Sequence, residues 1–456
     1  MVRQYSTEKD VLLPRDPNKT YNPWMCLLLG PVVMFHITAY FLQMLIINQY
    51  SYFRFLDEHF PEISGNATKL DQSKCANSTA SDVYEAQVQM QSLTSKFTIY
   101  ITLAAGLPGI FASLLFGSFS DTYGRKPFIA LPLLGTLIKG ILCAVGIYFK
   151  VNIYVFLAFI LLEGLTGTFM STITMELAYI ADVTLPGKNR SLFIALAEMA
   201  GGTGALIGSV LSGYFINQSS YLAPMTSSCV IVSLGLMIIL LLLPETLTYS
   251  NQEHPTLMSR LKEVVSFYLH DTSQSGKKWD YILCIVILTF SSMVTFGRTN
   301  VETLYQINTP FCWGPVKIGW FVAIRMAAQF ILGLSLIRIC QACWEDEIIG
   351  MFGAITCFAS FILEAFAVTD LELLLVPAVG IGSQVTSPMI KAIMSKMTNP
   401  NKQGVLTAGI GMTESSCSLV GTVLSGAVYS VTVSFFRGSV FILFAVFVAA
   451  AIFFLM

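Results

Sequence analysis

Ionisable side chains stand inside apolar stretches of this sequence, where a charge is costly and usually faces a cavity or a partner. Carboxyls such as Glu198 and Glu414 can bind and release a proton as their surroundings change. Buried cations such as Lys391 and Arg325 are stabilised by a carboxylate or phosphate. These residue types indicate proton transfer combined with binding of an organic anion. Ten candidates share this placement: His36, Lys139, Glu163, Glu176, Glu198, Arg298, Arg325, Glu364, Lys391 and Glu414.

Glu198 and Glu414 each precede a glycine-rich stretch in two similar segments. Glu198 lies ten residues before Gly208, and Glu414 lies seven residues before Gly421. We expect both to lie near the cytosolic half of related helices and to carry protons. The alternative is a permanent pair between each carboxylate and a buried cation. Arg325 has the corresponding alternative, an ion pair that holds its helix to a neighbour.

The other candidates divide between substrate contact and structure. Glu163 is central in its segment, beside Gly164, and we expect it to line the substrate cavity. For Lys139 a structural ion pair is the better explanation, and Glu364, near a helix end, is expected at the membrane interface. A lone histidine such as His36 is more often a hydrogen-bonded packing residue than a functional group.

The elements that must position these residues follow from composition. The chain of 456 residues is 54% hydrophobic and 12% charged, and its mean hydropathy is +0.68, whereas a soluble domain carries about 25% charged residues. This composition excludes a soluble enzyme, and a net charge of −1 excludes nucleic acid as a main partner. Only helices or closed barrels avoid unpaired backbone groups in lipid, and continuous apolar runs favour helices. Twelve segments are long enough to cross a bilayer: 24–48, 97–119, 127–149, 153–178, 191–216, 221–243, 280–300, 317–339, 347–368, 371–394, 404–430 and 435–456.

The positive charges set the expected topology. With a cytosolic N-terminus, 15 Lys and Arg residues fall on the cytosolic side and 7 on the other, so both termini are predicted to be cytosolic. Sequons at Asn66 and Asn77 lie in the predicted luminal loop and are expected to be glycosylated. The predicted units are a cytosolic tail (1–23), a six-helix bundle (24–243) with luminal loop 49–96, a cytosolic linker (244–279) and a second six-helix bundle (280–456). We expect a monomer.

Two of the ten cysteines differ from the rest, which mostly lie in apolar spans. Cys75 and Cys312 are in predicted luminal loops, on the oxidising side where disulfides persist. We expect them to pair; two free thiols are the alternative.

The two predicted bundles share an internal repeat. The segment Ile207–Gly213 matches Val420–Gly426 at an offset of 213 residues, and each follows a Pro-x-Lys turn. A parallel repeat of this kind is typical of two-bundle transporters that bind substrate between the bundles. Small residues at this spacing also permit close helix packing, and both explanations can hold together.

A charged motif lies between the second and third predicted helices. It consists of Gly117, Asp121, Gly124, Arg125 and Lys126. Its spacing and location resemble the signature of the major facilitator superfamily, a fold with twelve helices in two six-helix bundles. The resemblance implies a cytosolic seam that holds the outward-open state, with Asp182 or Glu176 and the start of the eleventh helix as partners. A short basic loop that only obeys the positive-inside rule is the alternative.

A narrower resemblance covers nearly the whole chain. Four short motifs carry it: Ala181-Asp182-Val183, Leu304-Tyr305 followed by Pro310 to Trp313, Ser395-Lys396 and Gln403-Gly404. They are similar to solute carrier family 46, which comprises the proton-coupled folate transporter and its relatives. The two sequons and the cysteine pair also fit that family.

The family resemblance implies roles for five positions. Glu198 matches the coupling glutamate, and Lys391 stands in place of a substrate-side arginine. Glu414 is similar to a glutamate of the other family branches. Thr295 stands where the folate transporter has a proton-responsive histidine, and Thr168 replaces an important aspartate. These two departures place folate itself in question.

The sequence predicts a proton-coupled symporter that imports an organic anion, either folate-like or like a muropeptide or cyclic dinucleotide. A proton-driven antiporter of drug-like solutes is the alternative, and a non-transporting receptor is the alternative of another class. The chain has no nucleophile elbow, metalloprotease pair or phosphate loop, so no enzyme activity is expected. No metal or cofactor is expected besides the coupling proton. The expected location is the plasma membrane or an endolysosomal membrane, the latter suggested by a dileucine pattern at Glu8–Leu13.

Overall fold

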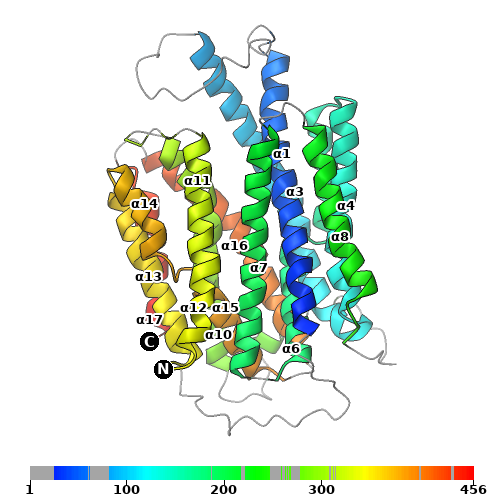
Figure 1. Cartoon of the computed structure of the whole chain (residues 1–456), viewed down its shortest axis with the longest axis vertical. Coiled ribbons are helices and arrows are strands. Elements are labelled where there is room, and N and C mark those ends of the chain that lie inside the picture. Colours follow the sequence, from blue (N-terminus) through cyan, green and yellow to red (C-terminus); the bar gives the residue numbers. More distant parts are fainter. Residues whose placement is uncertain are drawn as a thin grey trace.

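The computed structural model of the chain is built of helices (Figure 1). It describes residues 25–59, 61, 82–185, 187–216, 221–246, 258, 262, 264, 266–268, 278–307, 310, 311, 313, 315–399, 402–432 and 436–455. Every regular element among these residues is helical, which confirms the all-α prediction. The helices are α1 (Cys26–His59), α3 (Asp82–Tyr123), α4 (Lys126–Tyr148), η3 (Ile153–Val155), α5 (Phe156–Leu165), α6 (Phe169–Val183), α7 (Lys188–Ile216), α8 (Leu222–Leu241), α10 (Lys278–Ile307), α11 (Pro315–Met326), the π-helical segment η5 (Ala327–Gly333), α12 (Leu334–Cys340), α13 (Asp346–Phe366), α14 (Asp370–Val379), α15 (Thr386–Met397), α16 (Gln403–Thr432) and α17 (Ser439–Leu455).

Each predicted span coincides with a helix or a run of consecutive helices. Within the described ranges, nine helical segments are long and apolar enough to cross a membrane. The other three predicted spans correspond to the interrupted pair α14 and α15, to α16 and to the short apolar helix α17. The number of crossings and the cytosolic placement of both termini stay predictions.

Two helices extend well beyond their predicted spans. Helix α1 continues to His59 instead of ending near residue 48, and α3 begins at Asp82 instead of near residue 97. Hydropathy marks only the part of a helix that crosses hydrocarbon, whereas helical hydrogen bonds can continue into water. The predicted loop 49–96 is therefore partly helical.

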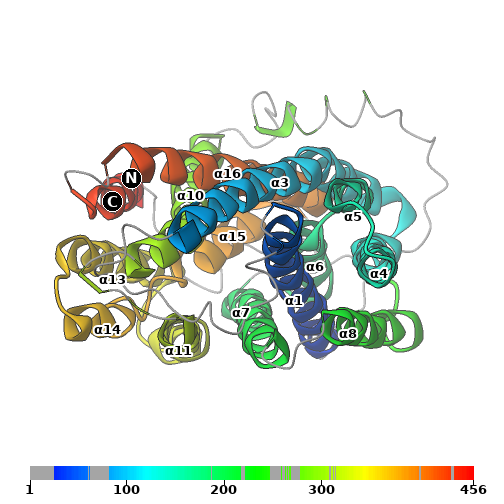
Figure 2. The same cartoon turned by 90° about the horizontal axis from the view of Figure 1, so that it is seen from above.

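The helices form two groups that meet along a common interface (Figure 2). Helices α1 and α3 to α8 make one group, and α10 to α17 make the other, called here the N-half and the C-half. Helix α3 packs against α16, and α7 packs against α11, η5 and α15. Residues of α7, α15 and α16 can thus meet between the halves.

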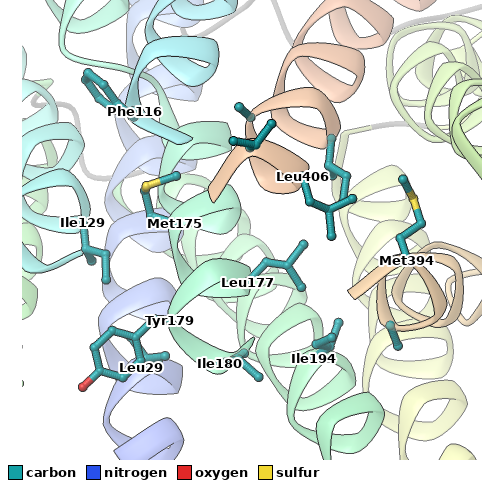
Figure 3. Packing of buried hydrophobic residues seen from close by; sticks show 14 of the residues in the cluster. Leu29, Phe116, Ile129, Met175, Leu177, Tyr179, Ile180, Ile194, Met394 and Leu406 are labelled. Atoms are coloured by element: carbon teal, nitrogen blue, oxygen red, sulfur yellow. The ribbon is translucent and has the colours of Figure 1, made fainter. Parts of the chain in front are cut away.

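An apolar core joins the two halves at the predicted cytosolic end. Figure 3 shows Met175, Leu177 and Ile194 of the N-half near Met394 and Leu406 of the C-half. All belong to one cluster of buried residues. Apolar side chains of the two halves are thus buried together at this end of the interface.

The fourth and tenth predicted spans are interrupted, which the sequence did not predict. Between α5 and α6 the backbone turns at Gly167, whose φ of +81° lies in the left-handed region that favours glycine. Between α14 and α15 the break spans 380–385. Gly167 and Gly380 are 213 residues apart, the offset of the internal repeat. The repeat therefore includes the two helix breaks.

The eighth predicted span contains the π-helical segment η5. A π-helical turn inserts a residue into the helix and is frequent at functional sites. Gly333, at its end, packs directly on the backbone carbonyl of Ile381 in the break before α15, where a Cβ would not fit. The irregular segments of two neighbouring helices thus meet inside the C-half.

Candidate functional site

The predicted motif of the second loop forms a buried charge cluster at the predicted cytosolic end. Arg125 donates to Asp182 at 2.9 Å and to Asp121 at 2.5 Å, and it is 1% exposed. Burial alone lowers the pKa of Arg125, but the negative charges of Asp121 and Asp182 outweigh it and raise the pKa above its usual value. The predicted alternative partner Glu176 is not among the hydrogen-bond partners of this guanidinium. Glu245 accepts from the backbone N–H groups of Arg125 and Lys126 and caps α4.

Helix α16 approaches this cluster closely. A Cβ on Gly117 would lie 2.5 Å from the Cα atom of Ala408, and one on Gly404 would collide with the carboxylate of Asp121. These two glycines therefore permit the contact between the N-half motif and the C-half. Gly124 has a φ of +96°, which a residue with a side chain rarely adopts.

A second polar seam crosses between the halves at the same end. Ser191 of α7 donates to Asp346 of α13 at 2.5 Å, and Asp346 also pairs with Lys396 of α15. Lys188 donates to the backbone carbonyl of Gln341 at 2.7 Å, and Arg190 donates to that of Ser395 at 3.0 Å. Several hydrogen bonds thus hold α7 against the C-half.

Lys391 lies at the centre of the interface, between the two glutamates predicted to carry protons. Its Nζ atom is 2.5 Å from Oε1 of Glu198 in α7 and 2.7 Å from Oε1 of Glu414 in α16. The side chains are 4%, 19% and 7% exposed for Lys391, Glu198 and Glu414. One ammonium therefore bridges carboxylates from both halves in a water-poor environment.

Glu176 of α6 adds a third carboxyl to this centre. It is 2% exposed and lies within electrostatic range of Glu198 and Lys391. Its Oε1 atom has no hydrogen-bond partner among the described residues. Three carboxyls thus surround a single ammonium. If all were ionised the group would carry a net charge of −2, and bound protons or an additional cation can neutralise that excess.

Arg325 lies in a different cluster, inside the C-half. Its Nη2 atom is 2.9 Å from Oε2 of Glu302, while Arg298 is 3.1 Å from Oε1 of Glu302 and 2.7 Å from Oε2 of Glu364. The predicted alternative, an ion pair to a neighbouring helix, is what the structure has. Glu364 is 0% exposed and faces the interior of the C-half, while its expected depth at the membrane interface stays a prediction. We call Arg298, Glu302, Arg325 and Glu364 the quartet.

Glu163 is buried in the N-half, and its described partners do not include Lys391. Its Oε1 atom accepts from Lys139 at 2.7 Å and from Thr136 at 2.8 Å. His36 hydrogen-bonds Thr136 through Nε2 and Thr172 through Nδ1, each at 2.9 Å. Both His36 and Lys139 have the structural partners that the sequence reasoning favoured, and Glu163 is the partner that holds Lys139.

Thr168 and Thr295 occupy the two positions that depart from the pattern of the folate transporter. Thr168 precedes α6 directly after the helix break and is 7% exposed. Thr295 donates to the backbone carbonyl of Ser291 within α10 at 2.9 Å. Neither threonine is among the described hydrogen-bond or ion-pair partners of Lys391. Cys75, Cys312, Asn66 and Asn77 lie outside the described residues, so the disulfide and the glycosylation sites stay predictions.

Glu302 was missed by the sequence analysis although it holds both arginines of the quartet. It lies two residues beyond the end of the predicted span 280–300, where a carboxylate is unremarkable. The signal available was its spacing from Arg298, because residues four apart share a helix face and can form an ion pair.

The arrangement can exchange partners on a buried cation. A proton on either glutamate would free one side of Lys391, and an incoming anion could take the vacated position. Because Glu198 belongs to the N-half and Glu414 to the C-half, such an exchange alters the contacts between the halves.

Comparison with known proteins gives a family for this geometry. The sequence model of the Major Facilitator Superfamily matches residues 76–301. The lysosomal proton-coupled steroid conjugate and bile acid symporter SLC46A3 of Gallus gallus is 26% identical over 427 residues, which cover 91% of this chain and 90% of that protein. The proton-coupled folate transporter of Rattus norvegicus is 25% identical over 418 residues, which cover 91% of this chain and 88% of that protein.

Solved structures share the fold over almost the whole chain. The human organic anion transporter MFSD10 (TETRAN) superposes with a TM-score of 0.75 at 13% sequence identity, covering 95% of this chain and 99% of that one. The proton:xylose symporter XylE superposes with a TM-score of 0.65 at 14% identity, covering 95% and 96%. These similarities concern the fold alone.

Proposed function

The chain is a transporter of the major facilitator superfamily that resembles solute carrier family 46, and on that premise we propose that it is a proton-coupled symporter importing an organic anion into the cytosol. It is an integral membrane protein and not an enzyme. The proposal rests on one observation above all, the ammonium of Lys391 shared between Glu198 and Glu414.

The proposed cycle begins with the carboxylates competing for one cation. Glu198 is the more exposed of the two at 19%, so it receives the proton first. Protonation removes its charge and leaves Lys391 held by Glu414 alone. A carboxylate or phosphate of the substrate then replaces Glu198 as the partner of Lys391, because charge-assisted hydrogen bonds favour an anion there. Proton binding thereby strengthens anion binding.

Rocking of the halves then carries both ligands across. Hydrogen bonds of α7 with Asp346, Gln341 and Ser395, together with the close approach of Gly404 to Asp121, join the halves at the predicted cytosolic end and support an outward-facing state. Breaking those hydrogen bonds opens the cytosolic side, where the higher pH removes the proton from Glu198. The restored carboxylate recovers Lys391 and displaces the anion.

The relatives narrow the class of substrate. Their names give folate, steroid conjugates and bile acids. These are amphipathic or aromatic anions, which suit a single buried cation at an otherwise apolar interface. Muropeptides and cyclic dinucleotides, suggested by the sequence resemblance, belong to the same test set. The corresponding membranes are the plasma membrane and the endolysosomal membrane.

Uptake into proteoliposomes tests the proposal. The purified protein is reconstituted with an internal pH of 7.5, and labelled anions are supplied at an external pH of 5.5 or 7.5. We expect accumulation only with the inward proton gradient, and its collapse on adding a protonophore. Absence of gradient-driven accumulation for every anion tested would contradict the proposal.

The two alternatives give different results in the same preparation. An antiporter would accumulate its solute when the proton gradient is reversed. A receptor would bind an anion saturably without moving it into the vesicle.

A further inference from the structure

The quartet in the C-half contains two carboxylates that are held very differently. Glu302 uses both oxygens, Oε1 toward Arg298 and Oε2 toward Arg325. Glu364 uses only Oε2, toward Arg298, and its buried Oε1 atom has no hydrogen-bond partner among the described residues. A buried carboxylate oxygen without a donor is costly. Glu364 is therefore the member of the quartet with an oxygen open to a proton.

Further unpaired polar atoms lie along the same helices. Gln306 follows Glu302 by four residues on α10, is 0% exposed, and has no described partner for either side-chain amide atom. Gln329 follows Arg325 by four residues and lies in the π-helical segment η5. It is also 0% exposed, and neither of its side-chain amide atoms has a described partner. The Nε atom of Arg325 is also unpaired. Buried groups of this kind are normally satisfied by ordered water or by a ligand.

A chain of polar contacts connects Gln306 with the protein surface. Its backbone carbonyl accepts from the backbone N–H of Trp313 at 2.9 Å. The indole of Trp313 donates to Asp370 at 2.6 Å, and the carboxylate of Asp370 is half exposed. Trp313 thus lies between the half-exposed Asp370 and Gln306, which is one helical turn beyond Glu302 of the quartet.

The titratable groups around Glu364 come from several helices. Arg298, Glu302 and Tyr305 approach from α10, Arg325 from α11, and Cys357 from its own helix. Tyr429 of α16, Arg437 ahead of α17 and Glu372 of α14 lie within electrostatic range of Tyr305. From α17 itself the described contacts to this region are apolar, through Phe441 and Phe444. Two arginines and one other carboxylate thus decide the charge that Glu364 meets.

We propose that Glu364 is a second proton-binding group, reached through water along Gln306, whose protonation makes the quartet able to attract the substrate anion. A hydronium ion gives its proton to Oε1 of Glu364 and leaves as water. The quartet changes from a net charge of zero to +1, because two guanidinium groups then face a single carboxylate. An anion in the interface restores neutrality, so proton and anion each favour binding of the other. The inference rests on the proposed symport and adds a second site to it.

Replacing Glu364 with glutamine imitates the protonated form. At pH 7.5 we expect the KM of Glu364→Gln for the anion to fall at least roughly fivefold, the lower end of coupling between two ligands. The pH dependence of KM should flatten, and the number of protons moved per anion should drop by one. Glu364→Asp keeps a carboxyl and should retain the wild-type pattern. Glu58→Gln, at an exposed position near the end of α1, serves as a control.

The outcomes separate the two proposals. If the wild type moves anions with protons but Glu364→Gln keeps the wild-type stoichiometry and KM profile, the second site is wrong and the symport stands. If the wild type moves no protons, both proposals fail. Should Glu364→Gln not fold, infrared spectra of the wild type and Glu364→Asp decide. A protonated-carboxyl band that grows on acidification must shift in Glu364→Asp, and an unshifted band would overturn the inference.

Discussion

Lys391 is the residue on which the two halves converge. A buried ion pair adds little net stability, because desolvation of the charges offsets their attraction, but removal of one partner is strongly destabilising. The contacts of Lys391 with Glu198 and Glu414 are therefore poorly explained as a device for stability. A role in which its partners are exchanged accounts for them better.

Replacement of Lys391 by alanine should affect binding and stability together. The KM for the anion should rise at least about tenfold, because the loss of one charge-assisted contact costs roughly 1.5–3 kcal/mol. The thermal stability should fall at pH 7.5, since the two carboxylates lose their cation, and part of it should return at pH 5.5 as they bind protons. An unchanged KM in uptake assays would exclude the anchoring role.

Individual site residues could be predicted, but their partners could not. The presence of Glu198, Glu414 and Lys391 in apolar segments identified each as a candidate. That one cation serves both carboxylates depends on how α7, α15 and α16 pack, which composition does not encode. The burial of Glu364 was not predictable for a similar reason, since nearness to a helix end does not say which face a side chain occupies.

At the scale of elements, the spans were predictable and their interruptions were not. Apolar composition continues through Gly167 and through 380–385, so hydropathy gives no sign of the two breaks. The repeat offset of 213 residues relates Gly167 to Gly380, and it becomes informative only when one break is known. The breaks separate α6 and α15, which carry Glu176 and Lys391, from the half-helices before them.

Contact between α3 and α16 should depend on Gly117. Gly117→Ala places a methyl group 2.5 Å from the Cα atom of Ala408, whereas nothing lies within 4 Å of a Cβ on Gly426. Gly117→Ala should therefore lower thermal stability and uptake. Gly426→Ala should be neutral or stabilising, because alanine is favoured in helices by up to about 1 kcal/mol. Equal effects of the two substitutions on the melting temperature would contradict the close packing.

The contact between Lys317 and Asp370 should persist at endolysosomal pH. The ammonium of Lys317 and the indole of Trp313 lower the pKa of Asp370 below its usual value of 3.8. A carboxyl with a lowered pKa stabilises the fold above its unfolded pKa, and this contribution is lost as the pH falls through the folded value. Asp370→Asn should thus destabilise equally at pH 5.5 and 7.5, by less than about 1 kcal/mol because both charges are half exposed. A loss confined to pH 7.5 would show that the carboxyl is already protonated at pH 5.5.

At the scale of the whole molecule, two charge clusters serve a transporter made of two halves. The Lys391 centre lies between the halves, and the quartet lies within the C-half. The all-helical architecture and the superfamily were predictable because lipid forces long apolar helices and because the motif from Gly117 to Lys126 has a specific spacing. The contacts that close the interface between the halves were not predictable from the sequence, because they join residues far apart in the chain, such as Ser191 and Asp346.

In the proposed cycle, proton binding at Glu198 releases Lys391 for the anion. The most direct measurement compares two modes of transport in Glu198→Gln, which cannot lose a proton at this position. Exchange of labelled for unlabelled anion across the vesicle membrane should continue and lose the part of its pH dependence that Glu198 contributes, while accumulation driven by a proton gradient should fall well below the wild-type level. Gradient-driven accumulation at the wild-type level in Glu198→Gln would contradict the claim.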